Sequence, residues 1–341
     1  MEFIELAELC DKGLSNLAQK DLVFDSGIYP VYGAPGEITK VDFFHQSKPY
    51  LGLIKDGAGV GRVMQLPANS SVIGTIQYIF PKENVDLKYL YYLIKYLDLG
   101  KANTGATIPH IYFKDYKKRK VKVREYSEQK HIGQILELID SHLRTYKKVL
   151  EQYDLLIKSR FVEMFGDPNM VALNKSVKFS SIAKIITGNT PSRKSPEYYG
   201  DYIEWIKSDN IISTNLYISQ AKEFLSEQGA AKGRVAPKDS LLMTCIAGSI
   251  RSIGNVGICD RSVAFNQQIN AIVLKNNINP LYIYWLLKLF KPSIIANVEM
   301  SLKGIISKSH LENMLIPIIA SQEEQELFIK FALQINKLKF A

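Results

Sequence analysis

The sequence has few of the residues that build disulfide frameworks or metal centres. Its 341 residues include three cysteines, Cys10, Cys245 and Cys259, which lie far apart and form no CxxC pair. The five histidines form no HExxH or other paired-ligand spacing. We therefore expect no disulfide framework and no metal site, and this cysteine usage fits a reducing compartment. The first residues are acidic where a secretory signal would be basic, and no apolar run approaches the length of a membrane span. These features predict a cytoplasmic protein without membrane contact.

Motifs of the common nucleotide-binding and DNA-modifying enzymes are missing as well. The sequence contains no GxxxxGK[ST] phosphate loop, no Asn-Pro-Pro-aromatic tetrapeptide and no paired-glycine motif for S-adenosylmethionine. The glycines of GAGVGRV (57–63) and AGSIRSIGNVG (247–257) are predicted to be turn residues. Asp201, Glu204 and Lys207 bear some likeness to a metal-dependent nuclease set, but such nucleases space the Glu and the Lys more closely. We interpret these three residues as surface charge and expect no catalysis by this chain.

The chain is predicted to contain an internal repeat. The stretch LKYLYYLIKYL (87–97) matches PLYIYWLLKLF (280–290), and Gly105 matches Gly304. Further along, QKHIGQILELID (129–140) falls on QELFIKFALQIN (325–336). Glycine turns flanked by strand-like runs precede each short helix pattern. The repeat predicts two similar mixed α/β units, each followed by a helix.

The helices between and after these units carry a coiled-coil signature. From Ile132, apolar residues recur in alternating steps of four and three, an average period of about 3.5 that marks a helix–helix seam. The first helix is predicted from about Ser127 to Phe165, where Gly166 ends it. The second begins at Ser321, whose spacing to Glu324 fits a capping box, and is expected to run to Ala341. Two domain-then-helix repeats predict an antiparallel coiled coil with a pseudo-twofold axis.

Several stretches in this doubled order resemble one protein family. ITGNTPSRKSPEYYGDYIEWIKSDNI (186–211), AFNQQINAIVL (264–274) and LLIKSRFVEMFGDP (155–168) are similar to the specificity subunits of type I restriction–modification systems. The resemblance implies two target recognition domains (1–125 and 167–320), a central spacer helix (126–166) and a shortened C-terminal spacer helix (321–341). Each domain would read one half of a bipartite, asymmetric target in double-stranded DNA. The helices would set the spacing between the half-sites.

The resemblance also implies partners. Modification subunits with S-adenosylmethionine would dock around the helices, and restriction subunits with ATP and magnesium would join them, while this chain binds no cofactor of its own. By the repeat, the second helix covers the first from about Tyr146 to Phe161. It would leave an apolar stripe to be covered by a modification subunit or a second copy of the chain. The stripe consists of Ile132, Leu136, Ile139 and Leu143. An autonomous DNA-modifying enzyme and a coiled-coil scaffold with nonspecific DNA affinity remain alternatives.

The charge balance points to a polyanionic partner. The net charge is +9, and Lys and Arg gather between Lys114 and Arg124 in a pattern typical of a strand with one basic face. Arg and Lys suit guanine edges and phosphates, and Asn and Gln suit adenine. For Asn266 and Gln267, bracing of the backbone before a strand is favoured over direct base reading. The predicted DNA-contacting residues are Lys55, Arg62, Thr104, Thr107, Lys114, Arg193, Lys194, Lys207, Ser208, Arg251, Asn266, Gln267, Ser301 and Lys303.

Overall fold

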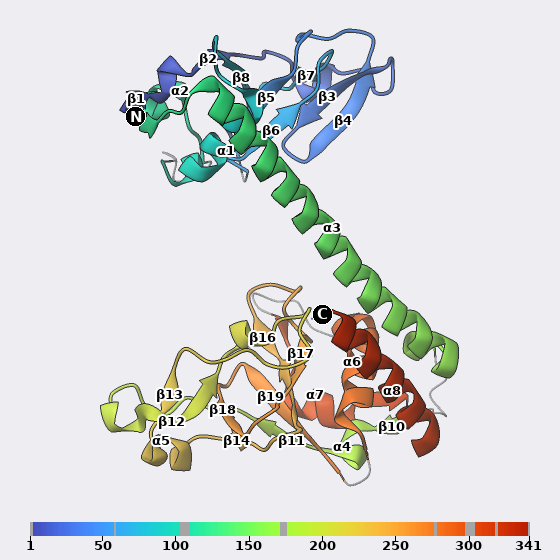
Figure 1. Cartoon of the computed structure of the whole chain (residues 1–341). Coiled ribbons are helices and arrows are strands. Elements are labelled where there is room, and N and C mark those ends of the chain that lie inside the picture. The colour runs from blue at the N-terminus through green and yellow to red at the C-terminus, as the bar shows by residue number, and fades with distance from the viewer. Residues whose placement is uncertain are drawn as a thin grey trace. The chain divides into compact units, whose positions relative to one another are not determined.

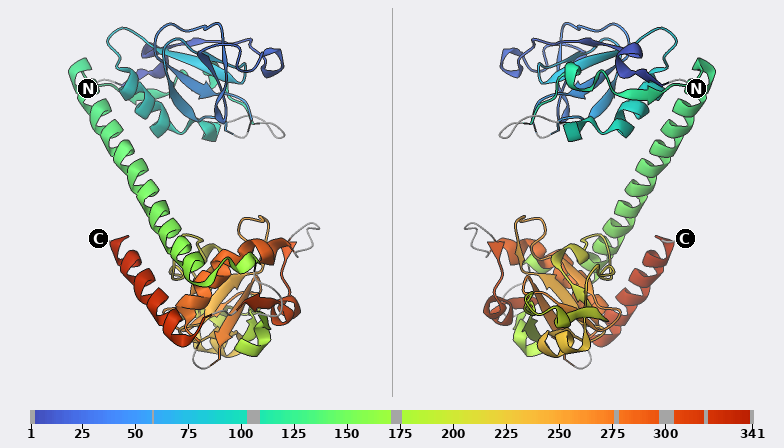
Figure 2. Two further views of the ribbon diagram at one scale, coloured as in Figure 1. Left: turned by 90° about the vertical axis from the view of Figure 1, so that its right-hand side faces the viewer. Right: turned by 90° about the vertical axis from the view of Figure 1, so that its left-hand side faces the viewer.

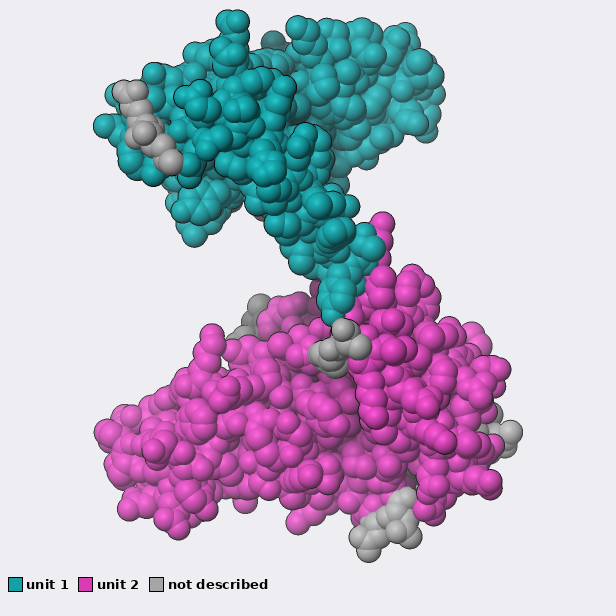
Figure 3. Space-filling view, viewed as in Figure 1, with its two compact units in different colours: residues 1–147 teal, residues 148–341 magenta. Residues whose placement is uncertain are grey.

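The chain folds into two compact units, residues 1–147 and 148–341, which are coloured separately in Figure 3. Among the described residues, no helix combines the length and the apolar character needed to cross a membrane. The computed structural model describes residues 3–57, 59–102, 109–170, 176–275, 278–296, 304–317 and 320–339.

Unit 1 contains nine strands and two short α-helices within its described residues, together with the first half of a long α-helix (Figure 1). The helices are α1 (Leu87–Leu97), α2 (Phe113–Tyr116) and α3 (Tyr126–Phe165). The strands are β1 (Phe3–Glu5), β2 (Cys10–Gly13), β3 (Tyr29–Gly33), β4 (Gly36–Val41), β5 (Tyr50–Ile54), β6 (Val63–Leu66), β7 (Ser71–Val72), β8 (Ile76–Pro81) and β9 (Lys120–Lys122).

The strands of unit 1 form three small sheets. A four-stranded antiparallel sheet has the order β2-β8-β5-β6, and β5 is buried along its whole length. In a second sheet, β4-β3-β7, the strand β3 pairs with β7 in parallel, and β1 pairs with β9. The amphipathic helix α1 buries Leu90 and Ile94 in a core with Leu51 and Ile79 of the large sheet. The one-sided apolar face of α1 explains this packing, because it covers one face of a sheet whose central strand β5 contributes to a core on each side.

Unit 2 contains the end of α3 and, within its described residues, a set of strands and five further helices. The helices are α4 (Phe179–Ile182), α5 (Glu227–Lys232), α6 (Pro280–Ala296), α7 (Lys308–Asn313) and α8 (Gln322–Leu338). The strands are β10 (Ser176–Lys178), β11 (Ala183–Thr187), β12 (Tyr199–Ile206), β13 (Phe224–Leu225), β14 (Val235–Ala236), β15 (Leu241–Thr244), β16 (Ile246–Ala247), β17 (Val256–Ile258), β18 (Val263–Phe265), β19 (Ile269–Leu274), β20 (Gly304–Ile305) and β21 (Leu315–Pro317).

The topology of unit 2 repeats that of unit 1, which confirms the predicted internal repeat. The sheet β11-β19-β15-β17 corresponds to β2-β8-β5-β6, and β10 pairs with β21 as β1 pairs with β9. The strand β12 pairs with β18 in parallel, as β3 pairs with β7. The predicted glycine turns recur too: Gly61 and Gly254 both have positive φ, and their amides donate to Ile54 and Thr244 of the preceding strands. Such a backbone conformation is easiest for glycine.

The first half of α3 packs against α1 in unit 1. A Cβ at Gly133 would lie 2.9 Å from Asp86 Oδ1 and 3.0 Å from the Tyr89 amide nitrogen, so the helices approach closely at this glycine. Ion pairs join Lys88 to Glu137 and Lys95 to Asp140 across the same contact. The predicted apolar stripe is therefore partly covered by its own unit.

The apolar stripe changes in exposure along α3. Ile132 and Leu136 are half-buried, whereas the side chains of Ile139 and Leu143 are 49 % and 53 % exposed. The stripe borders a hollow of about 460 Å³ whose walls are largely apolar and aromatic. The hollow is lined by Tyr89, Tyr92, Leu93, Lys95, Tyr96, Ile132, Leu136, Ile139 and Asp140.

The second half of α3 packs against α8 in an antiparallel contact, which we call the α3–α8 seam; Figure 2 shows the two helices side by side in both views. Phe328 packs between Phe161 and Phe165, with ring centroids 5.2 and 5.8 Å apart, and Lys339 forms an ion pair with Asp154. The pairs run in opposite directions along the two helices. The N-terminus of α8 is capped by the predicted box, because Ser321 accepts from the Glu324 amide and Glu324 accepts from that of Ser321.

The stretch of α3 that contacts α8 differs from the expectation. The contacts run from Asp154 to Phe165 rather than from Tyr146 to Phe161, and the Tyr146 side chain is 54 % exposed. The register is shifted because Tyr282 of α6 stacks on Phe161 and joins the same core. This third helix fixes α3 and α8 at a position that the repeat pattern of two helices does not reveal. Residues 340 and 341, which the prediction included in the helix, lie outside the described residues.

Candidate nucleic-acid interface

Three polar segments of unit 2 converge at one end of its sheets. They are the loop after β11 (188–195), the residues after β12 (207–208) and the turn between β18 and β19 (266–268). The Asn189 amide donates to the Phe265 carbonyl at 3.2 Å, and the Thr190 hydroxyl bonds to the side chain of Gln267. Ser208 Oγ lies 3.4 Å from Gln268 Oε1. Six of the predicted DNA-contacting residues lie in these segments. Asn266 is buried, and the other five share one surface: Arg193, Lys194, Lys207, Ser208 and Gln267.

A cluster of two cations, one carboxylate and two aromatic rings occupies this surface. Arg193 Nη2 lies 2.6 Å from Glu223 Oε2, and Lys207 Nζ bonds to the other oxygen of the same carboxylate. The Arg193 guanidinium lies 4.4 Å from the Tyr199 ring centre and 4.9 Å from that of Trp205. Hydrogen bonds from Lys207 and then Arg193 lower the pKa of Glu223, so the carboxylate is ionised at neutral pH. Arg193, Lys207 and Glu223 together carry one surplus positive charge.

The aromatic rings of this cluster are held in place by the fold. Trp205 is 3 % exposed, and its Nε1 donates to the Asn189 carbonyl at 3.4 Å. The Tyr199 hydroxyl donates to the Pro191 carbonyl at 2.7 Å. Fixed rings beneath a cation restrict its rotamers and favour its position electrostatically.

Asn266 and Gln267 differ in their environments. Asn266 is 6 % exposed; its Oδ1 accepts from the Gln268 amide and its Nδ2 donates to Gln268 Oε1, both at 3.1 Å. These bonds brace the turn before β19. A side chain committed in this way supports the bracing interpretation for Asn266, whereas Gln267 is exposed and faces the loop of Thr190.

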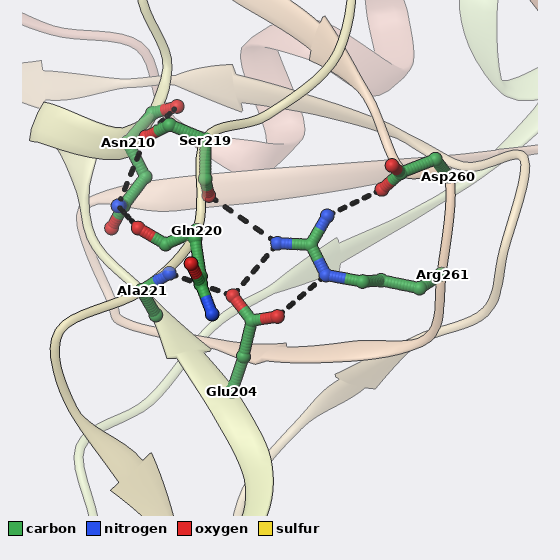
Figure 4. Close-up of polar contacts among 7 residues, drawn as sticks. All are labelled: Glu204, Asn210, Ser219, Gln220, Ala221, Asp260 and Arg261. Carbon is green, nitrogen blue, oxygen red and sulfur yellow. Dashed lines mark hydrogen bonds and ion pairs between the residues drawn. The ribbon is translucent and has the colours of Figure 1, made fainter.

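The carboxylate of Glu204 belongs to a separate network on β12, shown in Figure 4. It accepts from Arg261 Nε at 2.6 Å, from Arg261 Nη2 at 2.7 Å and from the Ala221 amide at 2.6 Å. The bonds from Arg261 lower the pKa of Glu204. Glu204 and Lys207 thus have different partners. The described part of the chain contains no group of three or more His, Cys, Asp or Glu residues that could hold a metal ion.

Lys194 and Arg251, which were also predicted, both lie in exposed loops. Lys194 follows Arg193, and its amide donates to Ser192 Oγ at 3.3 Å. Arg251 lies in the turn between β16 and β17, and its carbonyl accepts from Lys291 Nζ at 2.7 Å. Four predicted residues lie outside the described part of the chain: Thr104, Thr107, Ser301 and Lys303.

In unit 1, the predicted residues surround the turn between β5 and β6. Lys55 and Arg62 lie at its two ends, where the Ile54 amide donates to the Arg62 carbonyl at 2.9 Å. Arg62 also donates to the Ala34 carbonyl through its side chain. The Lys55 carbonyl accepts from the Ile111 amide. This bond holds the start of α2, which contains Lys114, near the turn between β5 and β6. The basic run forms the predicted strand, β9, with Val121 buried and Lys120 and Lys122 exposed.

Sequence reasoning missed two polar residues of this surface of unit 2, Glu223 and Thr190. Glu223 precedes β13, and its carbonyl accepts from the Trp205 amide, so Glu223 and Trp205 lie side by side. Because Arg193 lies over the Trp205 ring, Glu223 can reach it. Thr190 contributes through its bond to Gln267. A pairing of β12 with a two-residue strand leaves no periodic signal in the sequence, so neither contact could be read from it.

Comparison with known proteins identifies the family. The model of the type I restriction modification DNA specificity domain matches residues 1–152 and 173–337. The type I restriction enzyme MjaIX specificity subunit of Methanocaldococcus jannaschii is 26 % identical over 183 residues, 50 % of this chain and 41 % of the relative. The HindI specificity subunit of Haemophilus influenzae is 32 % identical over 111 residues, 32 % of this chain and 23 % of the relative. The matched stretches thus span less than half the length of these relatives.

A solved structure shares the fold. The S subunit of a type I restriction–modification system from M. genitalium superimposes with a TM-score of 0.62 at 17 % identity, and the match covers 99 % of this chain and 90 % of that one. The family model matches both repeats of the chain, including the loops that carry Arg193, Lys207 and Gln267. On this basis, the chain belongs to the family of type I restriction modification DNA specificity domains.

Proposed function

We propose that the chain is the non-catalytic DNA-specificity subunit of a type I restriction–modification complex. The observation that carries this proposal is the match of the family model to both halves of a chain whose two units share one strand order. Two related but different units suit a bipartite target whose halves differ, because each unit offers its own loops to the DNA. The catalytic cofactors, S-adenosylmethionine, ATP and magnesium, are assigned to the partner subunits.

The two recognition domains are proposed as residues 1–125 and 167–320. The polar loops of each domain contact one half-site: Lys55, Arg62 and Lys114 in the first, and Arg193, Lys207 and Gln267 in the second are the described residues that we favour. Lysine and arginine supply affinity through phosphates, and exposed amide and guanidinium groups read base edges. Support comes from the convergence of three polar loops on a surface with surplus positive charge in unit 2.

The helices 126–166 and 321–341 are proposed to form the antiparallel spacer of a pseudo-twofold arrangement. Support comes from the α3–α8 seam, in which Phe161, Phe165 and Phe328 share a core. Forty residues of α3 correspond to about 60 Å of helix at 1.5 Å per residue. A continuous helix of this length suits a role in setting the gap between half-sites.

The modification subunits are proposed to dock on the apolar stripe of α3 in unit 1. Support comes from the exposure of Ile139 and Leu143 and from the apolar hollow that the stripe borders with α1. Large apolar side chains aligned on one face of an exposed helix are typical of a binding surface. Sedimentation of the chain with and without its modification subunits tests this interface in the variants Leu136→Glu and Leu143→Glu. Loss of the complex supports docking by those subunits, loss of self-association instead points to a second copy, and unchanged masses rule out an interface here.

Genome-wide mapping of methylated adenine tests the function. Cells that carry this chain and its modification subunits are compared with cells that lack only this chain. A split motif with a fixed gap that disappears on deletion is the expected result. Unchanged methylation would contradict the proposal and favour a scaffold with nonspecific DNA affinity, and methyl transfer by the purified chain alone would make it an autonomous enzyme.

A further inference from the structure

We propose that Glu223 is an internal counter-charge that DNA phosphate displaces from Arg193 and Lys207, and that it thereby restrains the affinity of unit 2 for DNA. The inference rests on the proposed function, because it deepens the role of the surface on which these residues lie. Its basis is a carboxylate held by two cations that are themselves candidates for DNA contact.

The geometry of the carboxylate is that of a phosphate substitute. One oxygen of Glu223 lies 2.6 Å from Arg193 Nη2, and the other bonds to Lys207 Nζ. A phosphate presents two oxygens in the same way to a guanidinium and an ammonium group. The side chains of Arg193, Lys207 and Glu223 are 54 %, 33 % and 36 % exposed, so a ligand can reach the site from solvent. Ion pairs this exposed contribute little to stability, and exchange of one anion for another costs little.

The cations remain in position when the carboxylate is displaced. The rings of Tyr199 and Trp205 lie under the Arg193 guanidinium, and Lys207 Nζ lies 5.1 Å from the Trp205 ring centre. Since hydrogen bonds to backbone carbonyls fix both rings, the position of the rings does not depend on the Glu223 carboxylate. The cluster is therefore preorganised for an anion, with Glu223 reducing its charge until DNA arrives.

The neighbouring pair of Glu204 and Arg261 provides the contrast. Glu204 has a side chain only 14 % exposed, and its carboxylate also accepts from the Ala221 amide, which ties a loop to β12. Its bonds serve the fold, whereas those of Glu223 hold cations at the surface. The two carboxylates lie on or beside the same strand and make a matched pair for substitution.

The test is the DNA affinity of Glu223→Gln, measured by fluorescence anisotropy on the full chain assembled with its modification subunits. The probe is a labelled duplex of random sequence, titrated over a series of salt concentrations. We expect the affinity at low salt to rise roughly two- to fivefold, the range of an exposed ion pair. The slope of log affinity against log salt should steepen by up to about 0.9 for each additional phosphate that the protein neutralises. The higher affinity should vanish at high salt because of screening.

Two further comparisons make the test decisive. Glu204→Gln should lower thermal stability and leave the salt slope unchanged. Glu223→Gln should give no increase in affinity when it is added to a protein that carries Arg193→Gln and Lys207→Gln, because both cations that it would release are then missing. Unchanged or weaker DNA binding by a folded Glu223→Gln protein would overturn the inference, as would an increase that persists without both Arg193 and Lys207.

The failure of the proposed function would look different. The wild-type complex is also titrated with a duplex that carries the motif found by methylation mapping. Equal wild-type affinity for this duplex and for random DNA would refute sequence specificity whatever Glu223→Gln does. A specific wild-type complex whose affinity and salt slope are unaffected by Glu223→Gln would refute the counter-charge alone.

Discussion

Removal of one ring from the α3–α8 seam should destabilise unit 2 strongly. Phe328 is fully buried, and its ring contacts those of Phe161 and Phe165 at centroid distances of 5.2 and 5.8 Å. Truncation of a buried phenylalanine to alanine costs about 3–5 kcal/mol of unfolding free energy. The 17 residues of α8 form a marginal helix in isolation, so its order depends on this contact. We therefore expect Phe328→Ala to cost about 3–5 kcal/mol and to release α8.

Urea denaturation followed by tryptophan fluorescence measures this loss selectively. The two tryptophans of the chain, Trp205 and Trp285, both lie in unit 2 and are buried. The control is Leu327→Ala, whose side chain is 59 % exposed and whose loss should cost no more than about 0.5 kcal/mol. In the double variant with Phe161→Ala, the two losses should fall short of additivity by about 0.5–1.5 kcal/mol, the coupling of an aromatic pair. Equal stabilities of the Phe328→Ala and Leu327→Ala proteins would refute the seam.

Three further perturbations follow from particular contacts. The bonds from Arg261 lower the pKa of Glu204 below its usual 4.5. They therefore stabilise the fold above that pH, and the stabilisation is lost on acidification. When the thermal midpoint is measured against pH, that of Glu204→Gln should fall less steeply below about pH 4.5 than that of the wild type. Burial raises the pKa of the Cys10, Cys245 and Cys259 thiols to about 12, so a thiol reagent at mildly alkaline pH should modify them only after unfolding. Gly133→Leu should push α1 away from α3 and lower the stability of unit 1 by more than about 1 kcal/mol, seen by circular dichroism while the tryptophan transition stays in place.

The sequence predicted the elements that have a periodic apolar pattern or are bounded by capping and turn residues. The helix expected from Ser127 to Phe165 is observed from Tyr126 to Phe165, because apolar periodicity and Gly166 define its ends. The capping box at Ser321 forms as expected. The strand pairs on either side of the two glycine turns also formed as predicted, since alternation and turn residues are local signals.

Contacts between distant segments were harder to predict. The register of the α3–α8 seam depends on Tyr282 of α6, and no two-helix pattern contains that information. The ring platform of Arg193 depends on where β12 places Tyr199 and Trp205 relative to a loop. The sequence predicted residue types suited to DNA contact, but the carboxylate of Glu223, which pairs with two of them, could be found only from the strand pairing.

The two units differ in the acid that pairs with one pair of equivalent lysines, Lys95 and Lys288. Lys95 on α1 lies over Tyr91 and Tyr92, 5.6 Å from each ring centre, and pairs with Asp140 of the adjoining part of α3 at 3.1 Å. The equivalent lysine of α6, Lys288, also lies over two rings, at 5.6 and 4.7 Å.

The acid that pairs with the lysine comes from a different place in unit 2. Asn336 of α8 stands at the position that corresponds to Asp140, and Asp154 of α3 lies 3.5 Å from Lys288 instead. In unit 2 the acid that pairs with Lys288 is thus Asp154, from the second half of α3. In unit 1 the acid that pairs with Lys95 is Asp140, from the first half of α3.

The walls of the hollow beside α1 are largely apolar and aromatic, so a helix that enters it must bring apolar side chains there. At its edge, Asp140 pairs with both Lys95 and Arg144, which leaves one positive charge in excess. If a modification subunit docks here as proposed, the expected chemistry of its contact is an aliphatic or aromatic stripe, similar to that of α3 at Ile157 and Phe161.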